Sequence, residues 1–268
     1  MIKEIIVKNT ISQKTFYIWN LQYLQMTERE PSTYYGNIYK IPIGDFYKFA
    51  VSVDCVIFGY EHGKLEVLLI QRGAEPFKGQ WAVPGDLVYP YENIDNAAKR
   101  VLAELTGLND MYMDQAKAFG EVDRHPVGRV VTIGYFSLIK KALHDAKASS
   151  WAENLEWHDV NNVPKLAFDH NSILNAALER LRIRVRRQPV GFNLLPEKFT
   201  LLELQGLYES LLGERFDKPN FRKKVLDMKL LDSLDELQKN VRHRPAKLFK
   251  FNESRYAQLK EEGFDFAI

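Results

Sequence analysis

The chain has 268 residues, of which 46% are hydrophobic, so it exceeds the usual size of a single domain and can supply a core for two. Its 37 Lys and Arg nearly balance its 35 Asp and Glu, and no apolar run approaches the roughly 20 residues that a membrane-spanning helix needs. No signal peptide is recognisable, and the single cysteine, Cys55, excludes an internal disulfide, so we expect a cytoplasmic protein.

Residues 1–45 are expected to form an N-terminal extension. Two runs within it, 1–7 and 14–19, have the β-branched and aromatic composition of strands. No spacing in the segment is typical of a catalytic or metal site. Two roles fit it, packing on the domain that follows or building a dimer interface.

Residues 46–188 have the pattern of a layered α/β domain. Two strand-like runs, 50–60 and 65–71, are separated by a short polar turn and predict a β-hairpin. Three further strands and a helix are expected at 116–123, 129–139, 155–157 and about 172–186. A mixed sheet flanked by helices follows, which is an α/β/α sandwich of the α/β (α+β) class.

The segment 85–108 resembles the Nudix box, a pyrophosphohydrolase motif in which a loop ending in Glu precedes a helix that carries Arg and several Glu. Glu92, Arg100 and Gly107 match the loop glutamate, the helix arginine and the glycine after the helix. The resemblance implies that Glu92 pairs with Arg100. Gly107 suits the C-terminal end of a helix.

The same segment lacks most of the box's carboxylates. The opening glycine falls on Asp86, and two helix glutamates fall on Val101 and Leu105, which leaves Glu104. Residues three and four apart share a helical face, and Mg²⁺ needs clustered oxygen ligands on such a face. We therefore predict a Nudix-like fold with little or no hydrolysis, no catalytic residues, no metal site and no cofactor.

Residues 189–268 have the pattern of a DNA-binding domain. Thr200 is expected to cap a helix with one apolar stripe, which Gly213 ends. After a short turn, Asp217 is expected to cap a second, basic helix over 218–228. Two helices joined by a short turn predict a helix-turn-helix.

The region after the second helix predicts a winged variant. Strands are expected at 230–234 and 246–251, joined by a cationic tip. Residues 218–250 contain ten Lys and Arg and four Asp and Glu, a local charge of +6 in a chain whose total is +2. Such a patch suits DNA, because neutralising phosphates releases counterions and helix side chains reach base edges in the major groove.

The residues expected to contact double-stranded DNA lie on the second helix and the wing. They are Lys218, Asn220, Arg222, Lys223, Lys224, Lys239, Arg242, His243, Arg244 and Lys247. The alternative is that the basic helix is only the solvated face of a surface helix.

Nearly the whole chain resembles the Nudix-related transcriptional regulators, in which a Nudix-like effector domain precedes a winged helix-turn-helix. The segments 191–201, 207–208 and 217–224 are similar to that family's linker and DNA-binding entry. The box variant over 98–108, with Val and Leu in place of Glu, is similar to the branch that responds to a sugar, arabinose in the known case. Other members sense ADP-ribose and related nucleotides.

The resemblance implies a regulator that acts as a homodimer on a palindromic operator and keeps the old substrate cleft for a small effector. The candidate effector contacts, chosen by where a Nudix cleft lies, are Arg72, Asp86, Glu92, Glu104, Asp123 and Arg124.

Two other functions stay open. An active hydrolase of nucleoside diphosphate derivatives such as ADP-ribose would need replacement metal ligands, for example Asp86 or Glu121 beside Glu104. A protein-binding scaffold would bind no DNA. His125, His158 and His170 lack metal-ligand spacing, so we expect surface or hydrogen-bonded histidines.

Overall fold

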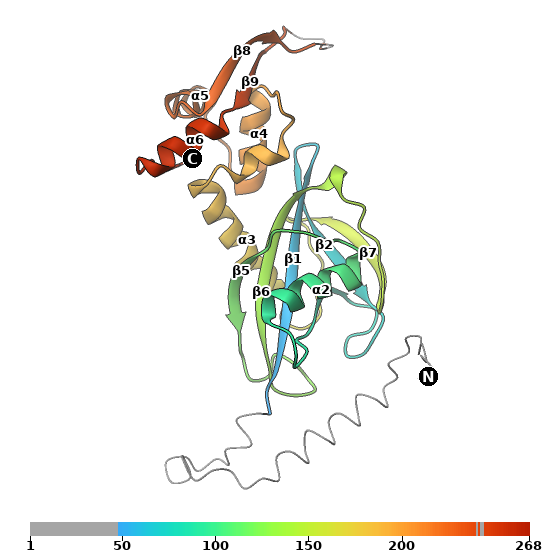
Figure 1. Ribbon diagram of the computed structural model, residues 1–268. Helices are drawn as coiled ribbons and strands as arrows, with labels where there is room; N and C mark the ends of the chain where they lie inside the picture. The colour runs from blue at the N-terminus through green and yellow to red at the C-terminus, as the bar shows by residue number, and fades with distance from the viewer. Residues whose placement is uncertain (1–47, 240, 242–243) are drawn as a thin grey trace, which may run out of the picture. The chain divides into compact units, whose positions relative to one another are not determined.

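A seven-stranded mixed sheet forms the centre of the first domain (Figure 1). The computed structural model describes residues 48–239, 241 and 244–268, so the predicted N-terminal extension lies outside the described residues. The strands are β1 (Ala50–Glu61), β2 (Lys64–Arg72), β3 (Trp81–Ala82), β4 (Gly85–Leu87), β5 (Asp114–Phe119), β6 (Val130–Lys140) and β7 (Ala152–Asp159). Their order is β3-β2-β1-β6-β5, with β4 added to β1 and β7 added to β2.

Strand β1 is buried on both faces and organises the sheet. It pairs in parallel with β6 along its whole length, and its C-terminal end forms the predicted antiparallel hairpin with β2. Successive side chains of a strand point to opposite faces. Accordingly Val53, Cys55 and Ile57 belong to one apolar cluster, whereas Val56 and Phe58 belong to the other.

One helix covers each face of the sheet. Helix α2 (Ile94–Thr106) is the box helix and packs on the side of Cys55, while α3 (His170–Arg187) packs on the side of Phe58. Asn93 caps α2 by accepting a bond from the Asn96 amide, and Gly107 ends it in the left-handed conformation with φ of 71°. The predicted α/β/α sandwich is confirmed.

The second domain is a winged helix. Its elements are η3 (Val190–Leu194), α4 (Leu201–Leu212), α5 (Lys218–Asp227), β8 (Leu231–Leu237), β9 (Lys247–Phe251) and α6 (Glu253–Glu261). Thr200 and Glu203 form a capping box at the start of α4, and Gly213 ends the helix with φ of 71°. The predicted helix-turn-helix and wing are therefore present.

Some boundaries differ from the sequence predictions. Strand β5 ends at Phe119, before Gly120, because residues 120–129 form a loop rather than a continuation of the strand. Strands β7 and β8 run several residues beyond the predicted ranges, since each gains backbone bonds to a neighbouring strand. The short helix η2 (Lys141–Leu143) and helix α6 were not predicted. Each helix in the part of the chain that the structure describes is too short or too polar to span a bilayer.

Candidate functional site

The box loop is braced by Arg100 on α2. Its guanidinium group donates to both carboxylate oxygens of Glu92 at 2.7–3.1 Å and to the Leu87 carbonyl at 2.9 Å. It also donates to Glu104 at 3.0 Å and lies 3.8 Å from the centre of the Tyr89 ring. The hydrogen bonds from Arg100 lower the pKa of Glu92. Glu92 and Glu104, both predicted as effector contacts, are thus engaged in holding the loop.

The side chains that replace the box glutamates point into the core. Val101 is 0% exposed and Leu105 1% exposed, and both pack in the apolar cluster between α2 and the sheet. Glu104 is exposed beside them. Asp86 on β4 is partly buried, and that burial raises its pKa.

These residues do not fit a magnesium site. Of the two replacement ligands considered, Asp86 lies near Glu104, whereas Glu121 is exposed in the loop after β5. Across the residues that the structure describes, no group of three or more His, Cys, Asp or Glu could hold a metal ion. The box keeps its bracing pair and lacks its ligand set.

A buried ionic network lies on the other side of β1. Arg124 donates to the two carboxylate oxygens of Asp169 at 2.7 and 3.0 Å and lies 3.7 Å from Asp54. Thr132 donates to Asp54 at 2.6 Å. The Arg124 side chain is only 4% exposed. Asp54, placed inside an otherwise apolar strand, therefore has both an ion pair and a hydrogen bond.

His170, the first residue of α3, completes this network. Its Nδ1 accepts a bond from the Val83 amide at 3.2 Å, which leaves the proton on Nε2, 3.4 Å from an Asp54 oxygen. Burial lowers the pKa of His170, so the ring stays neutral near pH 7. The prediction of a hydrogen-bonded histidine is confirmed here.

Arg72 lies in an aromatic setting next to this network. Its guanidinium carbon is 4.9 Å from the ring centres of both Trp151 and Phe168, and its Nε donates to the Pro76 carbonyl at 2.8 Å. The ring of His125 stacks on Phe168 at 5.1 Å. Burial lowers the pKa of Arg72.

Charge links Arg72 to the ionic network. The carboxylates of Asp54 and Asp86 raise the pKa of Arg72, against the larger effect of burial. Burial lowers the pKa of His125, and the positive charges of Arg124 and Arg72 lower it further. We call Arg72, Trp151, Phe168, His125 and Arg124 the Arg72 cluster. Cationic groups beside aromatic faces suit a ligand that combines a planar ring with negative charge.

The predicted effector residues therefore fall into three places. Arg72 and Arg124 both lie near His125, Glu92 and Glu104 surround Arg100, and Asp123 is an exposed loop residue. Asp86 lies between the first two groups, close enough to interact with both Arg72 and Arg100. Arg124 departs from the expectation of an open contact, since its guanidinium is buried and already paired. The sequence analysis missed the polar and aromatic partners Asp54, Trp151, Phe168 and Asp169, and it did not assign His170 to this site. One signal was available, because Asp54 is the charged residue inside the apolar run of β1.

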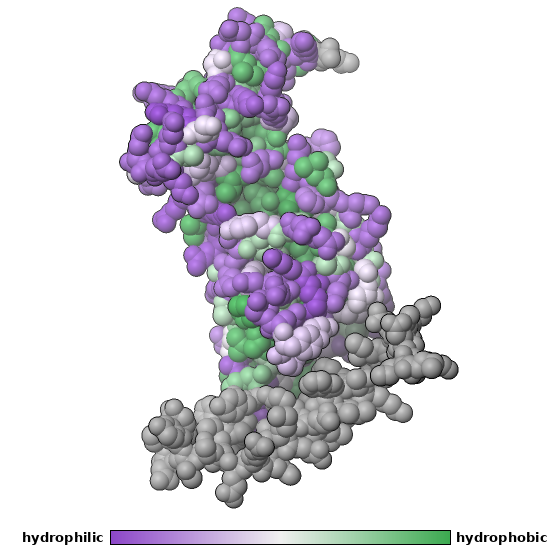
Figure 2. All heavy atoms as spheres, viewed as in Figure 1, coloured by the Kyte–Doolittle hydropathy of each residue, from purple (hydrophilic) through white to green (hydrophobic). Residues whose placement is uncertain are grey.

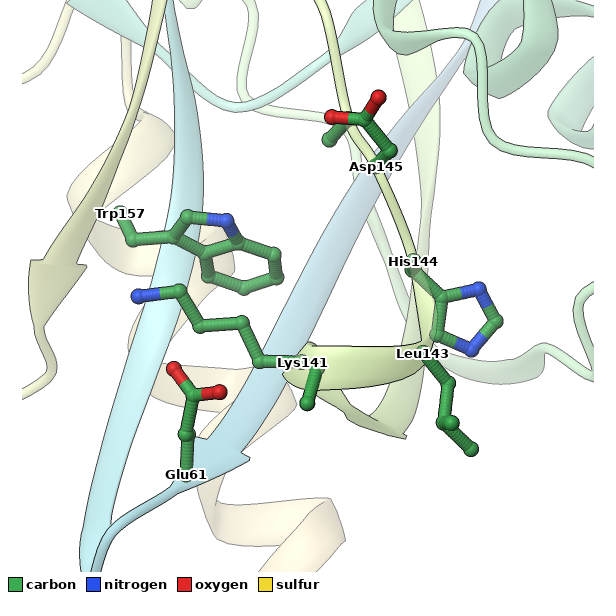
Figure 3. A pocket seen from close by; sticks show the side chains of 8 residues that line it. Glu61, Lys141, Leu143, His144, Asp145 and Trp157 are labelled. Carbon is green, nitrogen blue, oxygen red and sulfur yellow. The ribbon is translucent and has the colours of Figure 1, made fainter.

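Two pockets are lined by other residues. The pocket in Figure 3 measures about 450 Å³ and is lined by residues such as Glu61, Lys141, His144 and Trp157, with Lys141 extended beside the Trp157 ring. The other, about 590 Å³, lies between the β1–β2 hairpin and the segment joining η3 to α4. Neither is lined by a predicted effector residue.

The predicted DNA-binding residues gather on α5 and the wing. Phe221 and Val225 fix the orientation of α5, because both are buried in the winged-helix core. The described members of the set are exposed, and they are Lys218, Asn220, Arg222, Lys223, Lys224, Lys239, Arg244 and Lys247. Figure 2 shows the surface over α5, β8 and β9, in the upper part of the view, as largely hydrophilic. Arg242 and His243 lie outside the described residues.

Two family profiles match this chain. The NUDIX domain matches residues 48–177, and the NrtR DNA-binding winged helix domain matches residues 191–251. The chain is 36% identical to the ADPR responsive transcriptional repressor NtrR of Acinetobacter baylyi over 205 residues, which are 75% of this chain and 81% of that protein.

Two further proteins resemble parts of the chain. The ADP-ribose pyrophosphatase of Methanocaldococcus jannaschii is 36% identical over 125 residues, which are 47% of this chain and 70% of that protein. The crystal structure of Shewanella oneidensis NrtR with a 27mer DNA is 31% identical, with a TM-score of 0.58, over 75% of this chain and 93% of that one.

These relatives correct the expected likeness to a sugar-responsive branch. The names of both curated relatives refer to ADP-ribose and not to arabinose. The box variant was misleading for a physical reason. Replacing two glutamates with Val101 and Leu105 removes two carboxylates from the helix, but it carries no information on which effector the domain binds.

Proposed function

Because the chain belongs to the NrtR family, with a Nudix domain followed by an NrtR-type winged helix, we propose that it is a DNA-binding transcriptional repressor that binds ADP-ribose as its effector. The observation that carries the proposal is the likeness to an ADP-ribose-responsive repressor across both domains. The match to the NrtR crystallised with a 27mer DNA, which extends over 93% of that chain, supports the same proposal.

The chemistry of the Arg72 cluster supports an effector of this class. ADP-ribose combines a planar adenine ring with a doubly charged diphosphate. Phe168 and Trp151 supply aromatic rings, and Arg72, which lies over both, supplies positive charge. Arg124 lies close by, with its charge shared between Asp54 and Asp169. We propose that the ligand binds here and not in the pocket of Figure 3, whose lining mixes Lys141 with the carboxylates of Glu61 and Asp145.

The geometry of the winged helix supports DNA binding. Helix α5 presents Arg222, Lys223 and Lys224 to solvent while its apolar side is buried, as a helix that enters a major groove requires. Two copies of such a helix read two half-sites at a fixed spacing. A homodimer on a palindromic operator is therefore part of the proposal.

The proposal includes the loss of hydrolysis. Val101 and Leu105 belong to the core, and Glu104 is held by Arg100, so this helix offers no clustered carboxylates to a metal. ADP-ribose would then bind and dissociate unchanged. An effector must do so if DNA binding is to respond to its concentration.

Calorimetric titration of the full chain with ADP-ribose tests the effector assignment. Saturable binding at one site per chain, with the ligand recovered intact after incubation with Mg²⁺, is the expected result. Arabinose serves as the negative ligand. Absence of heat and of any thermal stabilisation by ADP-ribose would contradict the assignment.

A working hydrolase is the second candidate, because the Nudix domain is 36% identical to an ADP-ribose pyrophosphatase. This function predicts release of AMP and ribose 5-phosphate in the presence of Mg²⁺ or Mn²⁺. Turnover at ordinary enzymatic rates, on the order of 1–10 per second, would favour it over the regulator. A rate that an Asp86→Asn, Glu104→Gln variant leaves unchanged would point to a contaminating enzyme.

A further inference from the structure

Helix α3 connects the ionic network to the turn of the helix-turn-helix. At its start, the N-cap residue Asp169 is held by Arg124, and His170 is held by the Val83 amide. At its end, Arg186 donates to Glu214 at 2.9 Å, directly after α4. Because an α-helix is stiff over this length, a shift at one end is carried to the other.

Two more contacts fix the end of α3 against the winged helix. The guanidinium group of Arg182 lies so close to Gly213 that a side chain at that position would overlap it, with a Cβ only 2.6 Å from a guanidinium nitrogen. The Ile268 amide donates to the Arg186 carbonyl at 3.2 Å. Gly213 is the C-cap of α4, so α3 contacts the point where α4 turns toward α5.

Strand β1 provides a second connection from the same network. Asp54 in its middle lies 3.7 Å from Arg124. At its end, the hairpin turn to β2 carries the Gly63 carbonyl, which accepts a bond from the Ser210 hydroxyl at 2.5 Å. Ser210 lies in the last turn of α4, three residues before Gly213. Both connections therefore end at the same part of the winged helix.

We propose that effector binding is coupled to the DNA-binding domain through α3 and β1, the two elements that Arg124 joins at the ionic network. One guanidinium group holds Asp54 of β1 and Asp169 of α3 together, so a change in either ion pair moves two elements that meet at the end of α4. A diphosphate bound at the Arg72 cluster competes with these carboxylates for positive charge. The inference rests on the proposed function, and it adds the route by which the ligand acts.

The contact between α3 and α4 has a composition that suits rearrangement. Three buried polar atoms on these two helices have no hydrogen-bond partner among the described residues, namely Arg182 Nε on α3 and Gln205 Oε1 and the Tyr208 hydroxyl on α4. A buried polar group without a protein partner weakens the packing that contains it. The proposal therefore takes these two helices, and not the apolar core of the sheet, as the part of the protein that rearranges when the ion pairs of Arg124 change.

The experiment compares a double variant, Arg186→Ala with Ser210→Ala, with a matched control, Arg187→Ala with Ser149→Ala. The first removes one polar contact at the end of each connection. The control also removes an arginine and a serine, at exposed positions. The readout is the factor by which saturating ADP-ribose changes the Kd for DNA, measured by fluorescence anisotropy, with ADP-ribose affinity measured separately.

The proposal expects the double variant to bind DNA and ADP-ribose within about threefold of the wild type, while the coupling factor falls from at least fivefold to below about twofold. The control keeps the wild-type factor. A double variant with an unchanged factor overturns this inference and leaves the proposed function intact. A wild type that binds no ADP-ribose, or binds it without any effect on DNA affinity, overturns the proposed function and this inference together.

Discussion

Arg100 donates hydrogen bonds of 2.7–3.1 Å to both carboxylate oxygens of Glu92 at the centre of the box segment. The pair closes the loop between β4 and α2 and keeps the box frame in place. One helical position further on, Val101 is fully buried. The frame of a hydrolase motif is thus retained as a structural brace, while the side of the helix that would carry metal ligands has become core.

Substitution of Glu92 by Gln is expected to lower the free energy of unfolding by about 1.5–3 kcal/mol, because it removes the negative charge and replaces one of the two accepting oxygens with a donor, in a largely buried pair. The pKa of Glu92 is held below its ordinary value of 4.5, so its contribution is present above that pH and is lost as the pH falls through the lowered pKa. Urea unfolding at neutral and acidic pH checks both points.

The matched change is Glu104→Gln. Its side chain is 47% exposed and makes a single bond to Arg100, so an effect below about 0.5 kcal/mol is expected. Equal losses of stability for the two variants would show that Glu92 is not the main brace.

Restoring the box glutamates is expected to destabilise the domain without restoring hydrolysis. Glu at position 101 or 105 would enter sites that are 0% and 1% exposed, and an unpaired buried charge costs at least about 3 kcal/mol. Thermal unfolding and an ADP-ribose hydrolysis assay with Mg²⁺ report the two effects.

The control for this change is Asn96→Glu, which adds a carboxylate to an exposed position in the first turn of the same helix. Its effect should stay within about 0.5 kcal/mol. A stable Val101→Glu, Leu105→Glu protein that cleaves ADP-ribose would show that the core at this face accepts metal ligands, contrary to our account.

Replacement of His170 by Gln is expected to flatten the decline of stability in mild acid. Burial lowers the pKa of His170 below 6.5, so the unfolded chain binds a proton more readily than the folded protein. The contribution of His170 to the free energy of unfolding is therefore fully present above pH 6.5. Below that pH it falls by up to about 1.4 kcal/mol per pH unit, until the folded-state pKa is reached. The Gln side chain keeps an acceptor for the Val83 amide. If the free energy of unfolding changed with pH in the same way for the wild type and the variant, the assignment of a neutral His170 ring would be contradicted.

Single alanine substitutions at Arg222, Lys223 and Lys224 are expected to weaken binding to every DNA sequence and to reduce the salt dependence. Removal of one cation that neutralises a phosphate makes the slope of log K against log salt shallower by about 0.9. Anisotropy titrations over a range of salt concentrations measure the slope. Lys99→Ala, on the exposed side of α2, is the control and should leave it unchanged.

The sequence predicted those parts of the fold in which the deciding interactions are local. Thr200, Gly213 and Asp217 cap helices through bonds to residues three or four positions away, so the helix-turn-helix could be located closely. The bracing pair of Glu92 and Arg100 was accessible through the motif. The ends of β7 and β8 could not be predicted from the sequence, because they depend on which strand lies beside each of them.

The ionic network could not be assembled from the sequence. Asp54, Arg124, Asp169 and His170 come from distant segments of the chain, and only the sheet topology brings them together. Arg124 was selected for its position near a Nudix cleft, but nothing local indicated that its charge is shared between two carboxylates. Trp151 and Phe168 lie in loops, where apolar periodicity gives no signal.

The most direct test of the central claim is a titration of labelled DNA from the promoter of the chain's own gene with the full protein, at fixed moderate salt, with and without saturating ADP-ribose. The account predicts specific binding, at least about tenfold tighter than to unrelated DNA, and a change of at least about fivefold in apparent Kd caused by ADP-ribose that is recovered intact. Binding that neither distinguishes this promoter from unrelated DNA nor responds to ADP-ribose would contradict it.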